Sequence, residues 1–262
     1  MHYFSIATMF RNESHILKEW LDHYIYHGVD HFYLFDDYSD DNYIEIIQPY
    51  IDRGLITLYD NRDIPRLLEA RQMRTYDKLH KLRDQTTWLA IIDCDEFIWS
   101  PRDINLKNIL KELEDISSIE ISMIYFGNNG NLEQPKYVVP SCTKRCRWDN
   151  YIKFTKCIIK LNDIINFGVH NMVVNGKTKN LSVTDDDPDG TGDHCYFNLN
   201  HYYVQSKYQF LEKKFKYQDE TGGAYIKDYQ EYLDKYNDLT LRLNEIDDTR
   251  LLEQNRGLYT NT

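Results

Sequence analysis

Apolar segments of strand type alternate with amphipathic helical segments through the first hundred residues, and this alternation limits the fold more than any other feature of the sequence. The expected strands are 3–9, 31–35, 55–59 and 88–92, and the expected helices are 14–27, about 40–51 and about 66–83. This repeat predicts right-handed βαβ units on a mostly parallel sheet that is flanked by helices. The chain is therefore expected to be an α/β protein.

Local signals indicate where the first two helices begin and end. Ser14 is a favoured N-cap residue, and Gly28 is a favoured residue for ending a helix. For the second helix, Ser39 or Asp40 is the expected cap, and the helix should end close to Gly54.

The fourth expected strand leads directly into a cluster of carboxylates. Asp93, Asp95 and Glu96 fall within four positions, between Ile92 and Phe97. Like charges beside an apolar core raise one another's pKa and are costly to desolvate unless a cation neutralises them. Because Asp93 and Asp95 are two apart, both can reach one divalent ion at a strand-to-loop corner, and hard oxygen ligands favour Mg²⁺ or Mn²⁺. The alternative is that the carboxylates cap a neighbouring helix or face water.

Polar residues also follow the first two strands. In open parallel sheets, ligands bind beyond the carboxyl ends of the strands, so these residues and the carboxylate cluster should lie on one edge. The residues gathered there are Thr8, Arg11, Asn12, Glu13, Asp36, Asp37, Asp93, Asp95 and Glu96.

The remainder of the chain has a different character. A short helix is expected at 106–113 and an apolar strand at 119–126, and β periodicity with long loops continues to about residue 205. From Ser206 onward the sequence is helical and strongly charged. We predict one domain over 1–262, with a nucleotide-binding half at 1–100, an acceptor half at 101–205 and a helical tail at 206–262.

Composition excludes several classes of protein. The net charge of -11 comes from 42 acidic and 31 basic residues without a long basic run, so nucleic acid is not an expected partner. No segment approaches the ~20 consecutive apolar residues that span a bilayer, and no signal peptide is evident, so a cytoplasmic protein without a membrane span is expected. The five cysteines are sparse and odd in number, which favours free thiols. The oligomeric state is not indicated.

A set of motifs follows in a defined order from position 11 to about 214. They are Arg11-Asn12-Glu13, Trp20-Leu21-Asp22-His23-Tyr24, 28–37, Pro49-Tyr50-Ile51 with Gly54-Leu55, 88–97, Phe126-Gly127, and His201-Tyr202-Tyr203 followed by Ser206 and Phe210. Together they resemble the motifs of GT-A-fold glycosyltransferases of the family 2-like and family 92-like group. The combination is specific, although any single motif is weak.

The resemblance implies a GT-A, Rossmann-like fold and transfer of a sugar from a nucleotide-sugar donor, expected to be a UDP-sugar, to a glycan, protein or other hydroxyl acceptor, with inversion. Asp93 and Asp95 would be the D-x-D motif, whose Mn²⁺ or Mg²⁺ neutralises the diphosphate as the glycosidic bond breaks. His201 resembles an additional metal ligand from a C-terminal strand. The implied donor-binding residues are Thr8, Arg11, Glu13, Asp36 or Asp37, and Arg71 or Arg74.

An inverting transferase needs a carboxylate that takes the proton of the acceptor hydroxyl. The candidate bases are Asp185, Asp187, Asp186, Asp193, Glu96 and Asp149, and the sequence does not choose among them. The acidic loop at 185–190 also reproduces the first half of an EF-hand loop. However, Tyr196 stands where a bidentate Glu belongs, and no helices flank the loop, so calcium binding is disfavoured.

Two other functions are compatible with the same residues. A strand that ends in D-x-D also describes a haloacid-dehalogenase-type phosphatase, although that motif normally opens the fold, whereas three strands precede it here. A module that binds nucleotide-sugars or glycans without turnover is the other possibility, and the intact Asp93 and Asp95 count against it only weakly.

Overall fold

The structure is a computed structural model that describes residues 1–64, 71–147, 154–168, 172–184, 186, 195–216, 226 and 228–260. Packing divides the chain into two compact units. The first unit is Met1–Met123 with Lys153–Leu199, and the second is Ile124–Ile152 with Asn200–Thr262. The bounds of these two units differ from those of the expected halves and tail. That residues 1–262 act as a single transferase domain stays a prediction.

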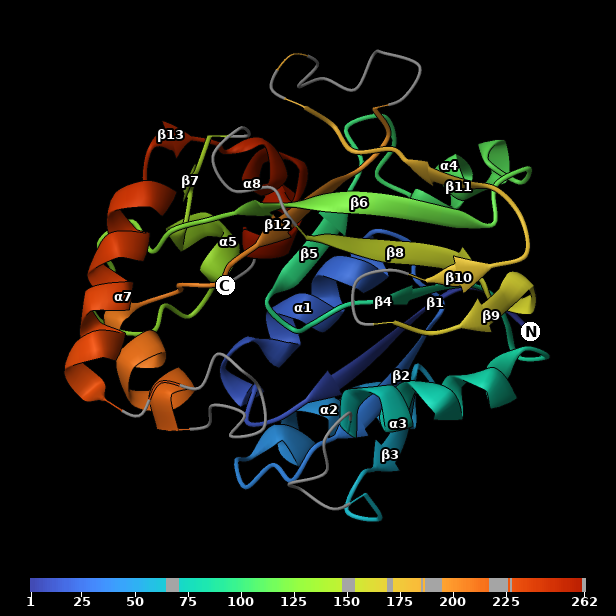
Figure 1. The fold of residues 1–262 in the computed structure, drawn as a ribbon, viewed down its shortest axis with the longest axis horizontal. Coiled ribbons are helices and arrows are strands. Elements are labelled where there is room, and N and C mark those ends of the chain that lie inside the picture. Colours follow the sequence, from blue (N-terminus) through green and yellow to red (C-terminus); the bar gives the residue numbers. More distant parts are fainter. Residues whose placement is uncertain are drawn as a thin grey trace. The chain divides into compact units, whose positions relative to one another are not determined.

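The first unit is built on a mixed, mostly parallel sheet with the strand order β3-β2-β1-β4-β8-β6-β12-β5, and β11 pairs with β6 (Figure 1). Strands β3, β2, β1 and β4 are mutually parallel, so their carboxyl ends lie on one edge, as expected. Strand β8 runs antiparallel to both β4 and β6. The strands are β1 (His2–Phe10), β2 (His31–Asp36), β3 (Ile56–Asp60), β4 (Thr86–Ile91), β5 (Glu96–Trp99), β6 (Ser118–Tyr125), β8 (Thr155–Lys160), β11 (Thr178–Asn180) and β12 (Asn198–His201).

The flanking helices follow the expected alternation and confirm the α/β fold class. They are α1 (Ser14–Tyr26), α2 (Tyr43–Asp52), α3 (Arg71–Asp77), the 3₁₀ helix η1 (Lys78–Leu82) and α4 (Leu106–Glu112). The expected side-chain caps are wrong, because neither α1 nor α2 has a side-chain hydrogen bond at its N-cap. Helix α1 does end at Gly28, whose φ of 87° suits glycine, and a Cβ there would lie 2.3 Å from the Asn105 side chain.

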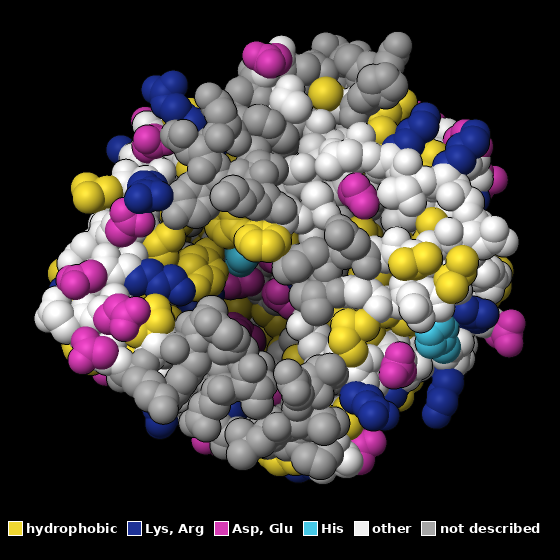
Figure 2. All heavy atoms as spheres, in the orientation of Figure 1, with side chains coloured by type: hydrophobic (Ala, Val, Ile, Leu, Met, Phe, Trp, Pro, Cys, Tyr) yellow, Lys and Arg dark blue, Asp and Glu magenta, His cyan; other side chains and the backbone are white. Residues whose placement is uncertain are grey.

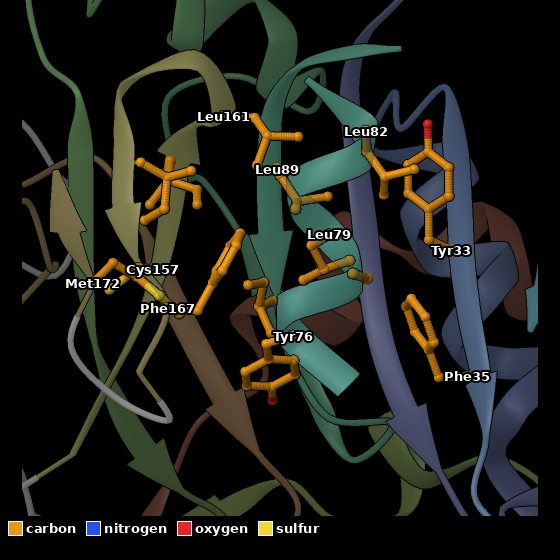
Figure 3. Close-up of a cluster of buried hydrophobic side chains, with 14 residues drawn as sticks. Tyr33, Phe35, Tyr76, Leu79, Leu82, Leu89, Cys157, Leu161, Phe167 and Met172 are labelled. Carbon is orange, nitrogen blue, oxygen red and sulfur yellow. The ribbon is translucent and has the colours of Figure 1, made fainter. Parts of the chain in front are cut away.

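One buried cluster packs α3 and η1 against the sheet. Tyr76 and Leu79 from these helices lie beside Leu89 of β4, and Cys157 of β8 extends the cluster (Figure 3). Burial of apolar area at about 25 cal/mol per Å² makes such clusters the main stabilising contribution to a sheet face. The cluster therefore anchors β4, which leads into residues 93–96, and its neighbour β8.

The second unit contains the helical C-terminal part, which was expected. Its core is formed by aromatic and aliphatic side chains of the segments after 200 together with Cys146. The elements are α5 (Val138–Ser141), β7 (Lys144–Arg145), the π-helix η3 (Gln209–Lys214), α7 (Tyr229–Leu243), β13 (Ile246–Asp247), α8 (Arg250–Gln254) and α9 (Arg256–Tyr259). Strands β7 and β13 pair antiparallel.

Minor elements complete the first unit: η2 (Leu161–Asp163), β9 (Ile164–Asn166) and β10 (Val173–Val174). All five cysteines are free, as the sequence indicated. In the part of the chain that the structure describes, no helix has the length and apolar character that a bilayer span requires.

Candidate functional site

The carboxylate cluster forms a tight turn between β4 and β5. The backbone N–H of Glu96 donates to the carbonyl of Asp93 at 3.1 Å, and the backbone N–H of Asp93 donates to Glu96 Oε2 at 2.8 Å. Glu96 is fully buried. Its carboxylate thus closes the turn, and this position makes Glu96 unsuitable as the base that meets an acceptor in solution.

Side chains of helix α1 form hydrogen bonds with the backbone of this turn. Trp20 Nε1 lies 3.1 Å from the carbonyl oxygens of both Asp93 and Glu96. The Tyr24 hydroxyl donates to the Glu96 carbonyl at 3.0 Å and accepts from the N–H of Ile98 at 2.7 Å. Burial raises the pKa of Tyr24 well above its ordinary value, so this hydroxyl stays protonated. The apolar face of α1 therefore also positions the backbone of the turn.

We expect Tyr24→Phe to lower the free energy of unfolding by about 1–3 kcal/mol, because it removes the acceptor of the buried Ile98 N–H and one of the two donors to the Glu96 carbonyl. Equilibrium urea unfolding should show a lower midpoint with an unchanged slope. Tyr26→Phe is the matched control, since Tyr26 lies on the same helix and is 38% exposed. Equal urea midpoints for Tyr24→Phe and Tyr26→Phe would contradict the role of Tyr24 in holding the backbone of the turn.

A buried lysine supplies the cation that the carboxylate cluster requires. The ammonium of Lys156 lies 2.7 Å from Asp93 Oδ2 and 3.4 Å from Glu96 Oε2. Burial disfavours the charged form, but the charges of Asp93 and Glu96 outweigh it and raise the pKa of Lys156 well above its ordinary value. The sequence analysis missed this residue. The need for a neutralising cation was the available signal, but it did not identify Lys156.

Several expected donor-site residues surround the thiol of Cys94. Thr8 Oγ1 lies 3.9 Å from Cys94 Sγ. Burial raises the pKa of this thiol, and the carboxylates of Glu13, Asp93 and Asp95 raise it further. The fold therefore brings Thr8, Glu13, Asp93 and Asp95 together at the edge of the sheet.

The end of β2 is organised differently from the expectation. Asp36 is 1% exposed, and its carboxylate accepts from the N–H of Ser39 at 2.9 Å and from Arg62 Nη1 at 2.9 Å. Arg62 also pairs with Asp60 at 3.1 Å and is 46% exposed. Arg62, which the sequence analysis did not single out, thus places a partly exposed guanidinium beside buried Asp36. A role of Asp36 toward a donor stays a prediction.

The other expected donor-site residues remain predictions. Arg11 follows β1 and Asp37 follows β2, and both are partly buried at this edge. Arg74 is exposed on α3. Arg71 begins α3, but its side chain lies outside the described residues.

The candidate bases and His201 also stay predictions. Asp186 is exposed, and the other candidates of the acidic loop lie outside the described residues: Asp185, Asp187, Asp193 and also Asp149. His201 ends β12 in the second unit, where its ring centroid lies 4.9 Å from that of Tyr125 and 5.6 Å from that of Tyr203.

In the part of the chain that the structure describes, neither a complete metal site nor a basic surface is evident. Among the described residues, no three His, Cys, Asp or Glu side chains are arranged to hold a metal ion. Figure 2 draws one face of the molecule, and over its described part Lys and Arg side chains are interspersed with Asp and Glu side chains. That distribution agrees with the net charge of -11 and differs from the basic stripe of nucleic-acid-binding proteins.

The family model of glycosyltransferase family 92 matches residues 1–235 of this chain. A glycosyltransferase family 92 protein of Ricinus communis is 26% identical over 133 residues, which cover 49% of this chain and 24% of the relative. Galactan beta-1,4-galactosyltransferase GALS3 of Arabidopsis thaliana is 28% identical over 114 residues, covering 41% of this chain and 23% of the relative. The chain thus matches about a quarter of the length of these curated relatives.

Solved structures that match this chain are less similar to it in sequence than these curated relatives. TarS 1-349 of S. aureus in complex with UDP-GlcNAc is 12% identical, with a TM-score of 0.46 over 97% of this chain and 73% of that one. Glucosyl-3-phosphoglycerate synthase of Mycobacterium tuberculosis, in complex with Mn²⁺, UDP and its product, is 12% identical, with a TM-score of 0.35 over 62% of this chain and 58% of that one.

Proposed function

The chain belongs to glycosyltransferase family 92, and from this premise we propose that it transfers a sugar from a nucleotide-sugar donor to a hydroxyl acceptor. The observation that carries the proposal is the position of Asp93. This carboxylate is 43% exposed and lies at the carboxyl edge of a parallel sheet, where α/β proteins bind their ligands. Membership of the family disfavours the phosphatase alternative.

The donor set at the turn fits a hard divalent cation. Asp93 Oδ1 makes no hydrogen bond or ion pair with any of the described residues, and Asp95 is partly exposed in the same turn. An exposed carboxylate would repel a diphosphate unless a cation lay between them, and the buried ammonium of Lys156 lies on the Oδ2 side. We therefore assign Mn²⁺ or Mg²⁺ to Asp93 and Asp95, and the role of His201 as a further metal ligand stays a prediction. When bound, the ion would neutralise charge that develops on the leaving diphosphate.

The remaining roles are assigned on the same premise. Thr8 and Glu13 would line the donor pocket beside the metal ligands, together with Arg11, Asp36, Asp37 and Arg71. A carboxylate of the acidic loop, Asp185 or Asp187, would accept the proton of the acceptor hydroxyl in an inverting reaction. Galactosyltransferases occur among the relatives, so UDP-galactose is the first donor to test.

Isothermal titration of UDP and GDP, each with and without Mn²⁺, tests the donor site directly. We expect Mn²⁺-dependent binding of UDP, because Asp93 and Asp95 would hold the ion and the ion would offset the negative charge of the diphosphate. Release of UDP from a UDP-sugar would then separate a transferase from a module that binds without turnover. Absence of binding for both nucleotides under every metal condition would contradict the proposed donor site.

A further inference from the structure

Lys156 reaches the carboxylate turn from a distant part of the sequence and is 2% exposed. Strand β8 runs antiparallel to β4 with Cys157 opposite Ile91, so residue 156 lies beside the end of β4. Its ammonium is 2.7 Å from Asp93 Oδ2 and 3.4 Å from Glu96 Oε2. Because it is buried, Lys156 does not meet a ligand in solution, and its ammonium pairs with these two carboxylates.

The two carboxylates that Lys156 contacts have different surroundings. The side chain of Glu96 is 1% exposed, and its Oε2 also accepts from the backbone N–H of Asp93. The side chain of Asp93 is 43% exposed, and Lys156 donates a hydrogen bond to its Oδ2 at 2.7 Å. Within the described part of the chain, Oδ1 of Asp93 has no polar partner. Asp93 is thus held through one oxygen and presents the other to solvent.

We propose that Lys156 is a positioning residue for a divalent cation, holding Asp93 through Oδ2 so that Oδ1 faces the ion in one orientation. The inference rests on the proposed function for the role of the ion. Partners that orient metal-ligating side chains reduce the ordering that binding requires, and their removal typically weakens metal affinity about 10–100-fold. The same ammonium offsets the charge of buried Glu96, which would otherwise be uncompensated.

Two variants separate positioning from stability. Lys156→Met removes the ammonium and keeps a chain of similar length. The double variant Lys156→Met, Glu96→Gln removes one positive and one negative buried charge, so we expect it to recover any stability that Lys156→Met alone loses. Near-ultraviolet circular dichroism and thermal melting would report its folding. Neither variant retains the contact to Asp93 Oδ2. Lys160→Met is the matched control, because Lys160 lies on the same strand and donates to the carbonyl of Glu114 instead.

The measurement is the affinity for Mn²⁺ alone, by electron paramagnetic resonance or calorimetry, without nucleotide. We expect both Lys156 variants to bind Mn²⁺ about 10–100-fold more weakly than the wild type, and Lys160→Met to bind it equally well. Unchanged affinity in the folded double variant would overturn the proposal. Tighter binding would also overturn it, since Lys156 would then act only as a charge that repels the ion.

This test is distinct from that of the proposed function. A wild type that binds Mn²⁺ but neither UDP nor GDP would contradict the transferase site and leave the comparison of the Lys156 variants valid. A wild type that binds no Mn²⁺ would overturn the positioning role.

Discussion

Asp93→Asn is expected to lower donor turnover by roughly 10³-fold or more. The substitution keeps the shape of the side chain but removes the charge that would hold the cation, and a catalytic metal stabilises the transition state by several kcal/mol, with each 1.4 kcal/mol worth about tenfold in rate. The assay is UDP release from the donor that binds in the titration. Mn²⁺-dependent nucleotide binding should be lost in parallel.

The matched control for this prediction is Asp115→Asn. Asp115 lies in the same unit, is exposed, and pairs with exposed Lys177 at 2.8 Å, so its variant should turn over donor at the wild-type rate. Thermal melts of both variants check that the fold is retained. If Asp93→Asn kept more than about a tenth of the wild-type rate, the assignment of Asp93 to the metal would be wrong.

Asp248→Ala is expected to lower the free energy of unfolding of the second unit by about 3–5 kcal/mol. Asp248 is 5% exposed and lies 2.7 Å from Nε of buried Arg145, and it also pairs with Arg250. Removing the carboxylate takes away the charge that lies 2.7 Å from the buried guanidinium of Arg145, and removing one member of a buried ion pair is costly. Urea unfolding at pH 7 measures the loss.

The control is the neighbouring Asp247→Ala. Asp247 is 78% exposed and its only ion pair among the described residues, with Lys144, spans 4.0 Å, so we expect a change within about 0.5 kcal/mol. If Asp247→Ala were as destabilising as Asp248→Ala, the effect would not come from the buried pair.

The stabilising effect of Asp248 should also depend on pH. Burial alone would raise the pKa of Asp248, but hydrogen bonds and charges from Arg250 and Arg145 outweigh it and hold the pKa below the usual 3.8. A depressed folded-state pKa means that the stabilisation is complete above the unfolded-state pKa and is lost as the pH falls through the folded-state value. The difference between wild type and Asp248→Ala should therefore be constant from pH 7 to 5 and shrink below about pH 4. A difference that shrank between pH 7 and 5 would contradict this assignment.

Much of the fold could be predicted because it is encoded locally. Apolar periodicity and the Gly28 terminator indicated the alternating elements, and the order of strands and helices implied that Asp36 and Asp93 follow strands ending on the same edge. The parallel registers of β1 with β2 and β4 confirm this edge. The helix caps were wrong because Ser14 and Ser39 were judged by type alone, and Ser39 instead donates its N–H to Asp36.

The partners of these carboxylates were decided only by tertiary structure. Lys156 lies 63 residues from Asp93 and meets it because β8 pairs antiparallel with β4, a contact that no local pattern encodes. Likewise, Arg62 engages Asp36 because β3 pairs with β2. The sequence by itself determined that carboxylates gather at the sheet edge. Which of them are neutralised inside and which face solvent depends on side chains brought in from distant strands, because burial and charge pairing are properties of the packed chain.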